Sequence, residues 1–236
     1  MPLQLFKATV CRVRDLTHDV REIDLRLVEP SKITFKAGQF LSFEVGQDAL
    51  KRTIIRPYSI ASPPSKVDVI TLLFNLVPGG PGSTYLFSLK EGDDTQFKGP
   101  TGAFYLRDDP ARDLLFVATG TGIAPLRSMF FTLAERGFPR PVTFFWGLRS
   151  RRDLYYQDEL EAWARAYPKF SFITTLSRPE NGWSGERGRV TPLVEKRVAS
   201  VQNLAAYLCG NEGMLQDVTA GIQKKGLCPI YREKYY

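Results

Sequence analysis

The chain has 236 residues, 43% of them hydrophobic and 24% charged, which excludes a single small domain and fits two globular domains of ordinary size. It holds no apolar run of roughly 18 residues or more and no secretory signal at its start, so we expect a cytoplasmic protein without a membrane span. The net charge of +7 comes with no lysine-rich tail or nucleic-acid-binding module, and Cys11, Cys209 and Cys228 lack metal-ligand spacing, so we expect neither nucleic acid nor a bound metal.

The first half of the sequence predicts short strands separated by turns. Alternating polar and apolar residues place these strands over 3–14, 19–28, 39–45, 53–59 and 68–75. No helix pattern lies between them, so we expect an antiparallel β-barrel, which the segment 96–104 closes. His18 falls in the first turn, where a solvated side chain is expected.

One of these strands ends in Arg56-Pro57-Tyr58-Ser59. Because side chains alternate along a strand, Arg56 and Tyr58 share one face and Ser59 takes the other. A guanidinium group binds phosphate well, and a phenol ring two residues away is suited to cover a flat heterocycle. The tetrapeptide is common by itself, so its assignment to a cofactor site depends on the motifs that follow it.

The segment Gly80-Pro81-Gly82-Ser83 predicts a second part of the same site. Its glycines allow the backbone to approach a ligand, and Ser83 is expected to cap a short helix that runs to about Leu89. Free N–H groups at a helix start bind phosphate. An ordinary turn with a serine cap is the alternative, and the Arg-x-Tyr-Ser strand upstream favours the phosphate site.

From residue 113 the pattern changes to strands alternating with helices. Residues 113–118 form an apolar run typical of a parallel strand buried on both faces, and Gly120-Thr121-Gly122-Ile123-Ala124-Pro125 then opens a helix that reaches about Arg136. A proline in the first helical turn is compatible with a pyrophosphate site at that turn. Further strands are predicted over 142–148, 170–176 and 204–209, and helices over 156–167, 191–198 and 212–225. This order predicts a doubly wound parallel α/β sheet, so we expect one domain over 1–108 and another over 109–236.

Ligands bind such sheets at the carboxyl ends of the strands, where the sequence places Arg149, Ser177-Arg178 and Cys209-Gly210-Asn211. Arg149 stands in the region where NAD-specific folds carry an acidic ribose-binding residue. The candidate phosphate contacts are Arg149, Arg178, Arg187 and Arg189, with solvated surface arginines as the alternative. Convergence of two of them would favour the 2′-phosphate of NADPH. Cys209 is expected to take part in the site, although most such cysteines are buried small hydrophobes.

Taken together, these motifs resemble those of the ferredoxin–NAD(P)H reductase superfamily. Arg56-Pro57-Tyr58-Ser59 is similar to the flavin motif of that family and Gly80-Pro81-Gly82-Ser83 to its phosphate motif. Gly120–Pro125 is similar to the nicotinamide-nucleotide turn and Cys209-Gly210-Asn211 to the Cys-Gly motif. The order and spacing match over nearly the whole chain.

The resemblance implies FAD on the barrel and NADPH or NADH on the α/β domain. Arg56 would contact the pyrophosphate, Tyr58 the isoalloxazine ring and Ser59 flavin N5, with Ser83 assisting at the phosphates. The other residues assigned to the two cofactors are Pro57, Gly80, Gly82, Thr84, Gly120, Thr121, Gly122, Pro125, Arg149, Ser177, Arg178, Gly210 and Asn211.

The last residues also resemble the family. Cys209 would lie near the reacting nicotinamide carbon, with Glu233 as a nearby carboxylate. An aromatic ring that stacks on the flavin maps to Tyr235, with Tyr236 as the alternative. The residues expected to act in catalysis are therefore Ser59, Cys209, Glu233 and Tyr235.

The resemblance implies an FAD-dependent NAD(P)H reductase that passes electrons to a separate one-electron carrier, an acidic ferredoxin or flavodoxin. The alternatives are a free-flavin reductase, a reductase component of a multicomponent oxygenase, and a non-catalytic docking module. The chain carries no plant-type ferredoxin module, so we expect no self-contained oxygenase reductase. It also lacks a cysteine cluster near the C-terminus, which disfavours a dihydroorotate-dehydrogenase-type electron subunit. A monomer is expected, and the sequence leaves NADH against NADPH open.

Overall fold

The computed structural model describes residues 4–109 and 111–235, and they form two compact units. The first unit takes in the chain up to Leu106 together with Arg127–Thr132. The second takes in Arg107–Leu126 and the chain from Leu133 onward. The domain boundary placed between residues 108 and 109 from the sequence stays a prediction.

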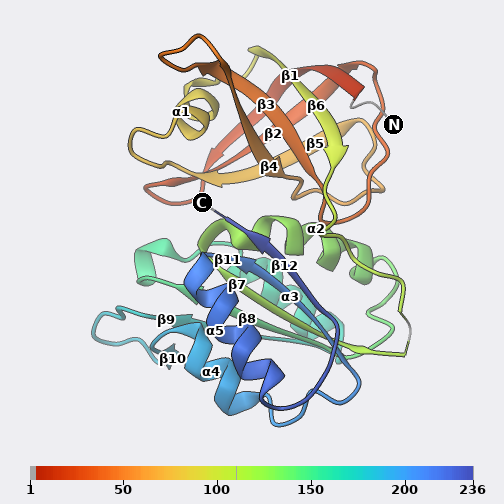
Figure 1. The fold of residues 1–236 in the computed structure, drawn as a ribbon, viewed down its shortest axis with the longest axis vertical. Helices are drawn as coiled ribbons and strands as arrows, with labels where there is room; N and C mark the ends of the chain where they lie inside the picture. Colours follow the sequence, from red (N-terminus) through yellow and green to blue (C-terminus); the bar gives the residue numbers. More distant parts are fainter. Residues whose placement is uncertain (1–3, 110, 236) are drawn as a thin grey trace. The chain divides into compact units, whose positions relative to one another are not determined.

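The first unit is an antiparallel sheet that curls into a barrel (Figure 1). Its strands are β1 (Gln4–Asp15), β2 (Val20–Glu29), β3 (Phe40–Gln47), β4 (Thr53–Ser59), β5 (Val69–Asn75) and β6 (Asp94–Thr101), in the order β4-β3-β6-β1-β2-β5. A bridge between Ile60 and Leu72 joins the two ends of that order. Alternating side chains such as Ile23, Leu25 and Phe43 fill the interior, so the barrel predicted from the sequence is confirmed.

The helix α1 (Pro81–Ser88) begins earlier than the sequence suggested. Its N-cap is Gly80, which has no side chain to cap the helix, and Pro81 occupies the first helical position. The prediction that Ser83 caps this helix is wrong. Proline fits the first turn because its missing N–H has no helical partner there, so the helix starts at Pro81 and Ser83 lies inside it.

The second unit holds a parallel sheet, which confirms the predicted α/β fold (Figure 1). Its strands are β7 (Asp113–Thr119), β8 (Val142–Leu148), β9 (Phe170–Leu176), β10 (Glu186–Arg187), β11 (Leu204–Gly210) and β12 (Ile230–Lys234), in the order β10-β9-β8-β7-β11-β12. The two edge strands, β10 and β12, were not predicted. Because β12 pairs with β11, it brings the last described residues to the carboxyl end of the sheet.

Helices connect these strands. They are α2 (Ile123–Ala134), α3 (Gln157–Ala166), α4 (Val190–Arg197) and α5 (Glu212–Gln223), with the short helical turns η1 (Gly120–Gly122) and η2 (Arg151–Asp153). Apolar residues of α4 and α5 cover one face of the sheet, where Val194 and Val218 pack with Val117 and Leu208. Within 4–109 and 111–235, no helix has the length and apolar character needed to cross a membrane.

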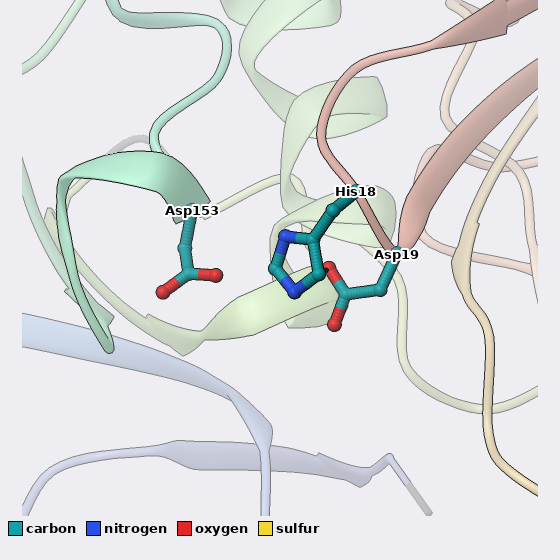
Figure 2. A group of neighbouring side chains, drawn as sticks. All are labelled: His18, Asp19 and Asp153. Carbon is teal, nitrogen blue, oxygen red and sulfur yellow. Dashed lines mark ion pairs between the residues drawn. The ribbon is translucent and has the colours of Figure 1, made fainter.

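His18 lies in the turn between β1 and β2 and is exposed, as the sequence predicted (Figure 2). Its Nε2 lies 3.6 Å from Asp19 Oδ1 within the same turn. In the second unit, Asp153 accepts hydrogen bonds from the Ser150 backbone N–H and hydroxyl at 2.8 and 2.7 Å. Asp153 therefore has a local structural role at η2.

Candidate functional site

The first candidate site forms where β4 meets the start of α1. A methyl group added to Gly82 would lie 2.5 Å from Tyr58 Oη and 2.8 Å from Arg56 Cγ. Only glycine therefore lets the helix start approach both side chains. The structure brings together the arginine, the tyrosine and the glycine that the sequence assigned to one cofactor.

Tyr58 is held in place by aromatic neighbours. Its ring lies edge-on to Phe43 at 5.9 Å and to Phe74 at 5.7 Å between centroids. Burial raises the pKa of Tyr58 to about 12, against a smaller lowering by Arg56, so the phenol stays neutral at physiological pH. Arg56 itself is exposed, and it shares one face of β4 with Tyr58.

Ser83 shapes the loop before α1. Its hydroxyl accepts from the Val77 N–H at 3.0 Å and lies 3.2 Å from the carbonyl oxygens of Val77 and Gly80. These contacts fold the glycine-rich loop back on the helix start. The buried Ser83 therefore positions the backbone donors of the first turn, while Thr84 is exposed beside it.

Ser59 and Pro57 lie on the other face of β4. Ser59 is 2% exposed and pairs with Phe40 of β3, whereas Pro57 is exposed opposite Ser42. The alternation predicted for Arg56, Tyr58 and Ser59 is consistent with this register. Because Ser59 is buried, its hydroxyl has a fixed position.

The second candidate site lies at the carboxyl ends of β7 and β11. A methyl group on Gly122 would lie 2.3 Å from the Cys209 carbonyl oxygen, and one on Gly210 would lie 2.2 Å from Thr119 Oγ1. The two glycines therefore let the nucleotide turn pack directly on the Cys209–Asn211 segment. Thr121 and Pro125 are buried in the same turn.

Asn211 joins this segment to the helix that follows. Its side-chain oxygen accepts from the Met214 N–H at 2.9 Å, which caps α5. Its backbone N–H and its amide each donate to Thr119 Oγ1 at 3.1 Å. One residue thus fixes the start of α5 against the end of β7.

Cys209 is fully buried and lies opposite Glu233 in the pairing of β11 with β12. Burial, and after it the Glu233 carboxylate, raise the pKa of the Cys209 thiol well above its ordinary value. A neutral thiol of this kind contributes shape rather than nucleophilic chemistry. The Tyr235 N–H donates to the Gly210 carbonyl oxygen at 2.9 Å, so Tyr235 lies beside the same segment. Tyr236 lies outside the described residues.

Two of the candidate arginines come together at the ends of neighbouring strands. The Arg178 N–H donates to the Arg149 carbonyl oxygen at 2.7 Å, and the Ser177 N–H donates to the Leu148 carbonyl oxygen at 3.0 Å. Arg149, Ser177 and Arg178 are all exposed. Arg187 and Arg189 are exposed as well, and Arg187 Nη2 donates to the Trp183 carbonyl oxygen at 2.7 Å.

Sequence reasoning missed two residues that shape the nucleotide turn. Thr119 accepts both hydrogen bonds from Asn211, and Trp146 Nε1 donates to the Gly120 carbonyl oxygen at 3.0 Å. A threonine directly before the glycine turn is a usable signal. The sequence around Trp146 gave no such signal, because Trp146 continues an apolar run whose composition is already explained by burial of the strand.

Comparisons with known proteins identify the two domain families of this chain. Residues 7–105 match the oxidoreductase FAD-binding domain family and residues 116–220 the oxidoreductase NAD-binding domain family. The toluate 1,2-dioxygenase electron transfer component of Pseudomonas putida is 32% identical over 234 residues, which cover 98% of this chain and 67% of that protein. The chain belongs to the ferredoxin–NAD(P)H reductase superfamily.

Other members of the superfamily extend the comparison. The chain is 29% identical to the ferredoxin–NAD(P)+ reductase component of the naphthalene 1,2-dioxygenase/salicylate 5-hydroxylase systems of a Ralstonia species, over all of this chain and 70% of that protein. Among solved structures, the cytochrome P450 reductase of Amycolatopsis is 29% identical with a TM-score of 0.88, over 99% of this chain and 70% of that one. The chain thus spans about two thirds of the length of these relatives.

The chain is an FAD-dependent NAD(P)H oxidoreductase with FAD and NAD(P)H as its cofactors. The residues of the first site fit FAD, because Gly82 leaves room for the helix start beside Arg56 and Tyr58. When bound, FAD supplies hydride acceptance and the release of single electrons. Transfer of electrons between NAD(P)H and an electron carrier is therefore the established class of reaction.

Proposed function

We propose that this superfamily member carries electrons from NAD(P)H through FAD to a separate ferredoxin- or flavodoxin-like carrier. The observation that supports it most is the relative named as a ferredoxin–NAD(P)+ reductase component, which matches the whole of this chain. The cytoplasm stays the predicted location, and a monomer the predicted state.

In this proposal the chain's own residues bind and orient the two cofactors. Arg56, Ser83 and Thr84 would hold the FAD phosphates, and the Tyr58 ring would lie against the isoalloxazine. The Ser59 hydroxyl would donate a hydrogen bond toward flavin N5 and so orient the ring. Gly80 and Gly82 allow the backbone to approach, while Pro57 stiffens the strand.

NAD(P)H is held at the second site. The turn from Gly120 through Pro125 presents the helix N-terminus to the pyrophosphate, and Gly210 and Asn211 line the opposite side. Cys209 shapes the place of the nicotinamide ring, and Glu233 lies across from it in the sheet. Tyr235, with Tyr236 as its alternative, stays the predicted ring for stacking on the flavin.

The chemical step is tested with Ser59→Ala and Cys209→Ala. Both variants should keep FAD through gel filtration and yet reduce it at least about tenfold more slowly, since a lost orienting contact costs of order 1–2 kcal/mol. Cys11→Ala, at an exposed thiol, is the control. Stopped-flow rates near wild type in both site variants would contradict the assignment.

A second candidate acceptor comes from other relatives. The phenol 2-monooxygenase reductase component of a Pseudomonas strain is 31% identical to this chain over 67% of that relative's length. A reductase of this kind delivers electrons to an oxygenase component. The two candidate acceptors are distinguished by measuring how fast the FAD-loaded chain reduces an acidic ferredoxin and an oxygenase component under the same conditions.

Reduction of free flavin is the remaining alternative. A yellow protein that keeps FAD through gel filtration supports a bound cofactor. A colourless protein that acts only on added flavin would replace the proposal by a free-flavin reductase. Absence of diaphorase activity with both NADH and NADPH would instead point to a docking module.

A further inference from the structure

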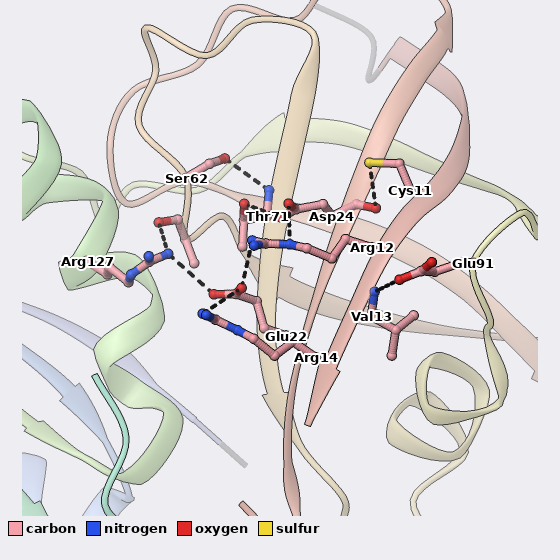
Figure 3. Close-up of polar contacts among 11 residues, drawn as sticks. Cys11, Arg12, Val13, Arg14, Glu22, Asp24, Ser62, Thr71, Glu91 and Arg127 are labelled. Atoms are coloured by element: carbon pink, nitrogen blue, oxygen red, sulfur yellow. Dashed lines mark hydrogen bonds and ion pairs between the residues drawn. The ribbon is translucent and has the colours of Figure 1, made fainter. Parts of the chain in front are cut away.

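A buried network of charges on β1 and β2 contacts the segment that follows β4, and the proposed function does not use it. Two carboxylates of β2, Glu22 and Asp24, are only 1% and 6% exposed (Figure 3). Buried carboxylates are costly unless cations and hydrogen-bond donors surround them. Each therefore has to be compensated by neighbouring groups.

Arginines of the neighbouring strand supply most of that compensation. Arg14 Nη2 lies 2.9 Å from Glu22 Oε1, and Arg12 Nη2 lies 3.0 Å from the same oxygen. Arg12 Nε lies 3.0 Å from Asp24 Oδ2. Glu22 thus has two close guanidinium groups within the sheet itself.

Arg127 adds a third guanidinium from outside the sheet. It lies in the part of α2 that belongs to the barrel unit, and it is 8% exposed. Its Nη1 lies 3.6 Å from Glu22 Oε2 (Figure 3). The same nitrogen lies 3.5 Å from the Ala61 carbonyl oxygen. Its guanidinium carbon lies 4.7 Å from the centre of the Phe131 ring. Arg127 is therefore the arginine of this network that reaches the chain just after the flavin motif.

The second carboxylate, Asp24, is connected to Ala61 and Ser62 through Thr71. The Thr71 hydroxyl donates to Asp24 Oδ1 at 2.6 Å, and the Thr71 N–H donates to Ser62 Oγ at 3.1 Å. The Ala61 N–H donates to the Thr71 carbonyl oxygen at 2.8 Å. Ala61 is thereby held on its N–H by Thr71 and on its carbonyl by Arg127.

We infer that Arg127, oriented by Glu22, is a positioning residue for Ser59, because it fixes the Ala61 carbonyl two residues further along the chain. Arg12 and Arg14 already lie within 3.0 Å of Glu22, so the distinct contribution of Arg127 is its contact with Ala61. A buried ion pair is better suited to fixing geometry than to adding stability. This inference rests on the proposed role of Ser59 at the flavin.

The matched variants are Arg127→Met and Arg14→Met. Each removes one guanidinium from Glu22, but only the first removes the contact with Ala61. Hydrogen exchange of the apoprotein reads out the segment directly, through the amide protons of Ile60 and Ala61, which bond to Gln39 and Thr71. We expect exchange there to rise about tenfold in Arg127→Met and to stay within about twofold of wild type in Arg14→Met.

The same variants are then loaded with FAD. Arg127→Met should slow flavin reduction at saturating NAD(P)H about tenfold and shift the visible flavin spectrum, with Arg14→Met close to wild type. Arg127→Lys keeps a donor for Ala61 and should recover part of the rate. If Arg127→Met does not fold, Glu22→Gln, which removes the charge that orients Arg127, takes its place in both measurements.

Wild-type exchange at Ile60 and Ala61 in Arg127→Met, or equal effects in both arginine variants, would overturn the inference. A wild-type protein that neither holds nor reduces FAD would sink the proposed function instead. The exchange measurement on the apoprotein is still informative in that case, so the two failures are distinguishable.

Discussion

At the scale of single residues, the approach of α1 to β4 depends on the missing side chain of Gly82. We expect Gly82→Ala to weaken FAD binding by about tenfold or more, since the new methyl group must displace Tyr58 Oη at 2.5 Å and the Arg56 stem at 2.8 Å. Fluorescence titration of the apoprotein with FAD measures it. Gly221→Ala is the control, because nothing lies within 4 Å of its added methyl group. An FAD dissociation constant that is unchanged in Gly82→Ala would show that this glycine is not part of the FAD site.

The burial of Cys209 predicts a thiol without reactivity. Its pKa is raised, first by burial and then by Glu233, so deprotonation is suppressed in the folded state through neutral and mildly alkaline pH. Native protein at pH 8 should react with a thiol reagent at Cys11, which is exposed, and leave Cys209 unmodified until urea unfolds it. Peptide mapping after the reaction gives the result. Rapid modification of Cys209 in folded protein would show that the thiol is accessible and ionised.

The neighbouring positions of Arg149 and Arg178 lead us to predict NADPH as the preferred donor. Their backbones are joined at 2.7 Å and both side chains are exposed, so two guanidinium groups are available to a 2′-phosphate. Arg178→Gln should lower kcat/KM for NADPH by about tenfold, a loss of about 1.4 kcal/mol, and leave NADH within about twofold. Arg165→Gln, on the exposed side of α3, is the control. Equal losses with both donors would remove the phosphate role.

At the scale of elements, the sequence carried enough to predict strands that bury both faces. The apolar run Leu114–Ala118 is typical of a strand buried on both faces, and it forms the buried strand β7. The edge strand β12 was missed because three of its five residues, Arg232–Lys234, are consecutive charged residues, and because it pairs on one side only. Local periodicity cannot show such pairing, since the partner strand lies far away in the sequence.

As with the strands, the parts of the site that have a local sequence pattern were predictable, and the contacts between distant segments were not. Motif spacing predicted that Arg56, Tyr58 and Gly82 serve one site, and the structure brings the three residues together. It could not show that Thr119 would bind Asn211, since that contact depends on how β7 and β11 pair. The place of Ser83 was misjudged because Pro81 sets the helix start.

Lys225, which follows α5, adds hydrogen bonds to the end of α4 beside the apolar packing of the two helices. Lys225 Nζ donates to the carbonyl oxygens of Glu195 and Val198 at 2.5 and 2.6 Å, at the end of α4, where carbonyls lack helical partners. Lys225→Met should lower the free energy of unfolding by about 1–3 kcal/mol, measured by urea denaturation. Lys224→Met, at the neighbouring position, is the control. A change below about 0.5 kcal/mol would show that water replaces both bonds.

At the scale of the whole molecule, the division into units differs from a simple cut in the sequence. Residues Arg127–Thr132 of α2 belong with the barrel, although they follow the first strand of the parallel sheet. Met129 shows why, because a methyl group on Gly38 would lie 2.4 Å from its Cε. Such contacts between distant segments leave no mark on local pattern, so linear motifs do not reveal them.

The net charge of the whole chain predicts how it meets its electron carrier. With a charge of +7, association with an acidic plant-type ferredoxin is attractive at long range and weakens as ions screen it over about 10 Å at 0.1 M salt and about 3 Å at 1 M. The second-order rate of ferredoxin reduction should therefore fall about tenfold or more between 50 mM and 500 mM salt. A neutral quinone acceptor serves as the control, because its encounter with the protein has no long-range charge term. Equal salt dependence of the rates with both acceptors would show that salt acts on flavin reduction. A ferredoxin reduction rate that does not change with salt would exclude charge steering and favour an acceptor recognised by apolar contact.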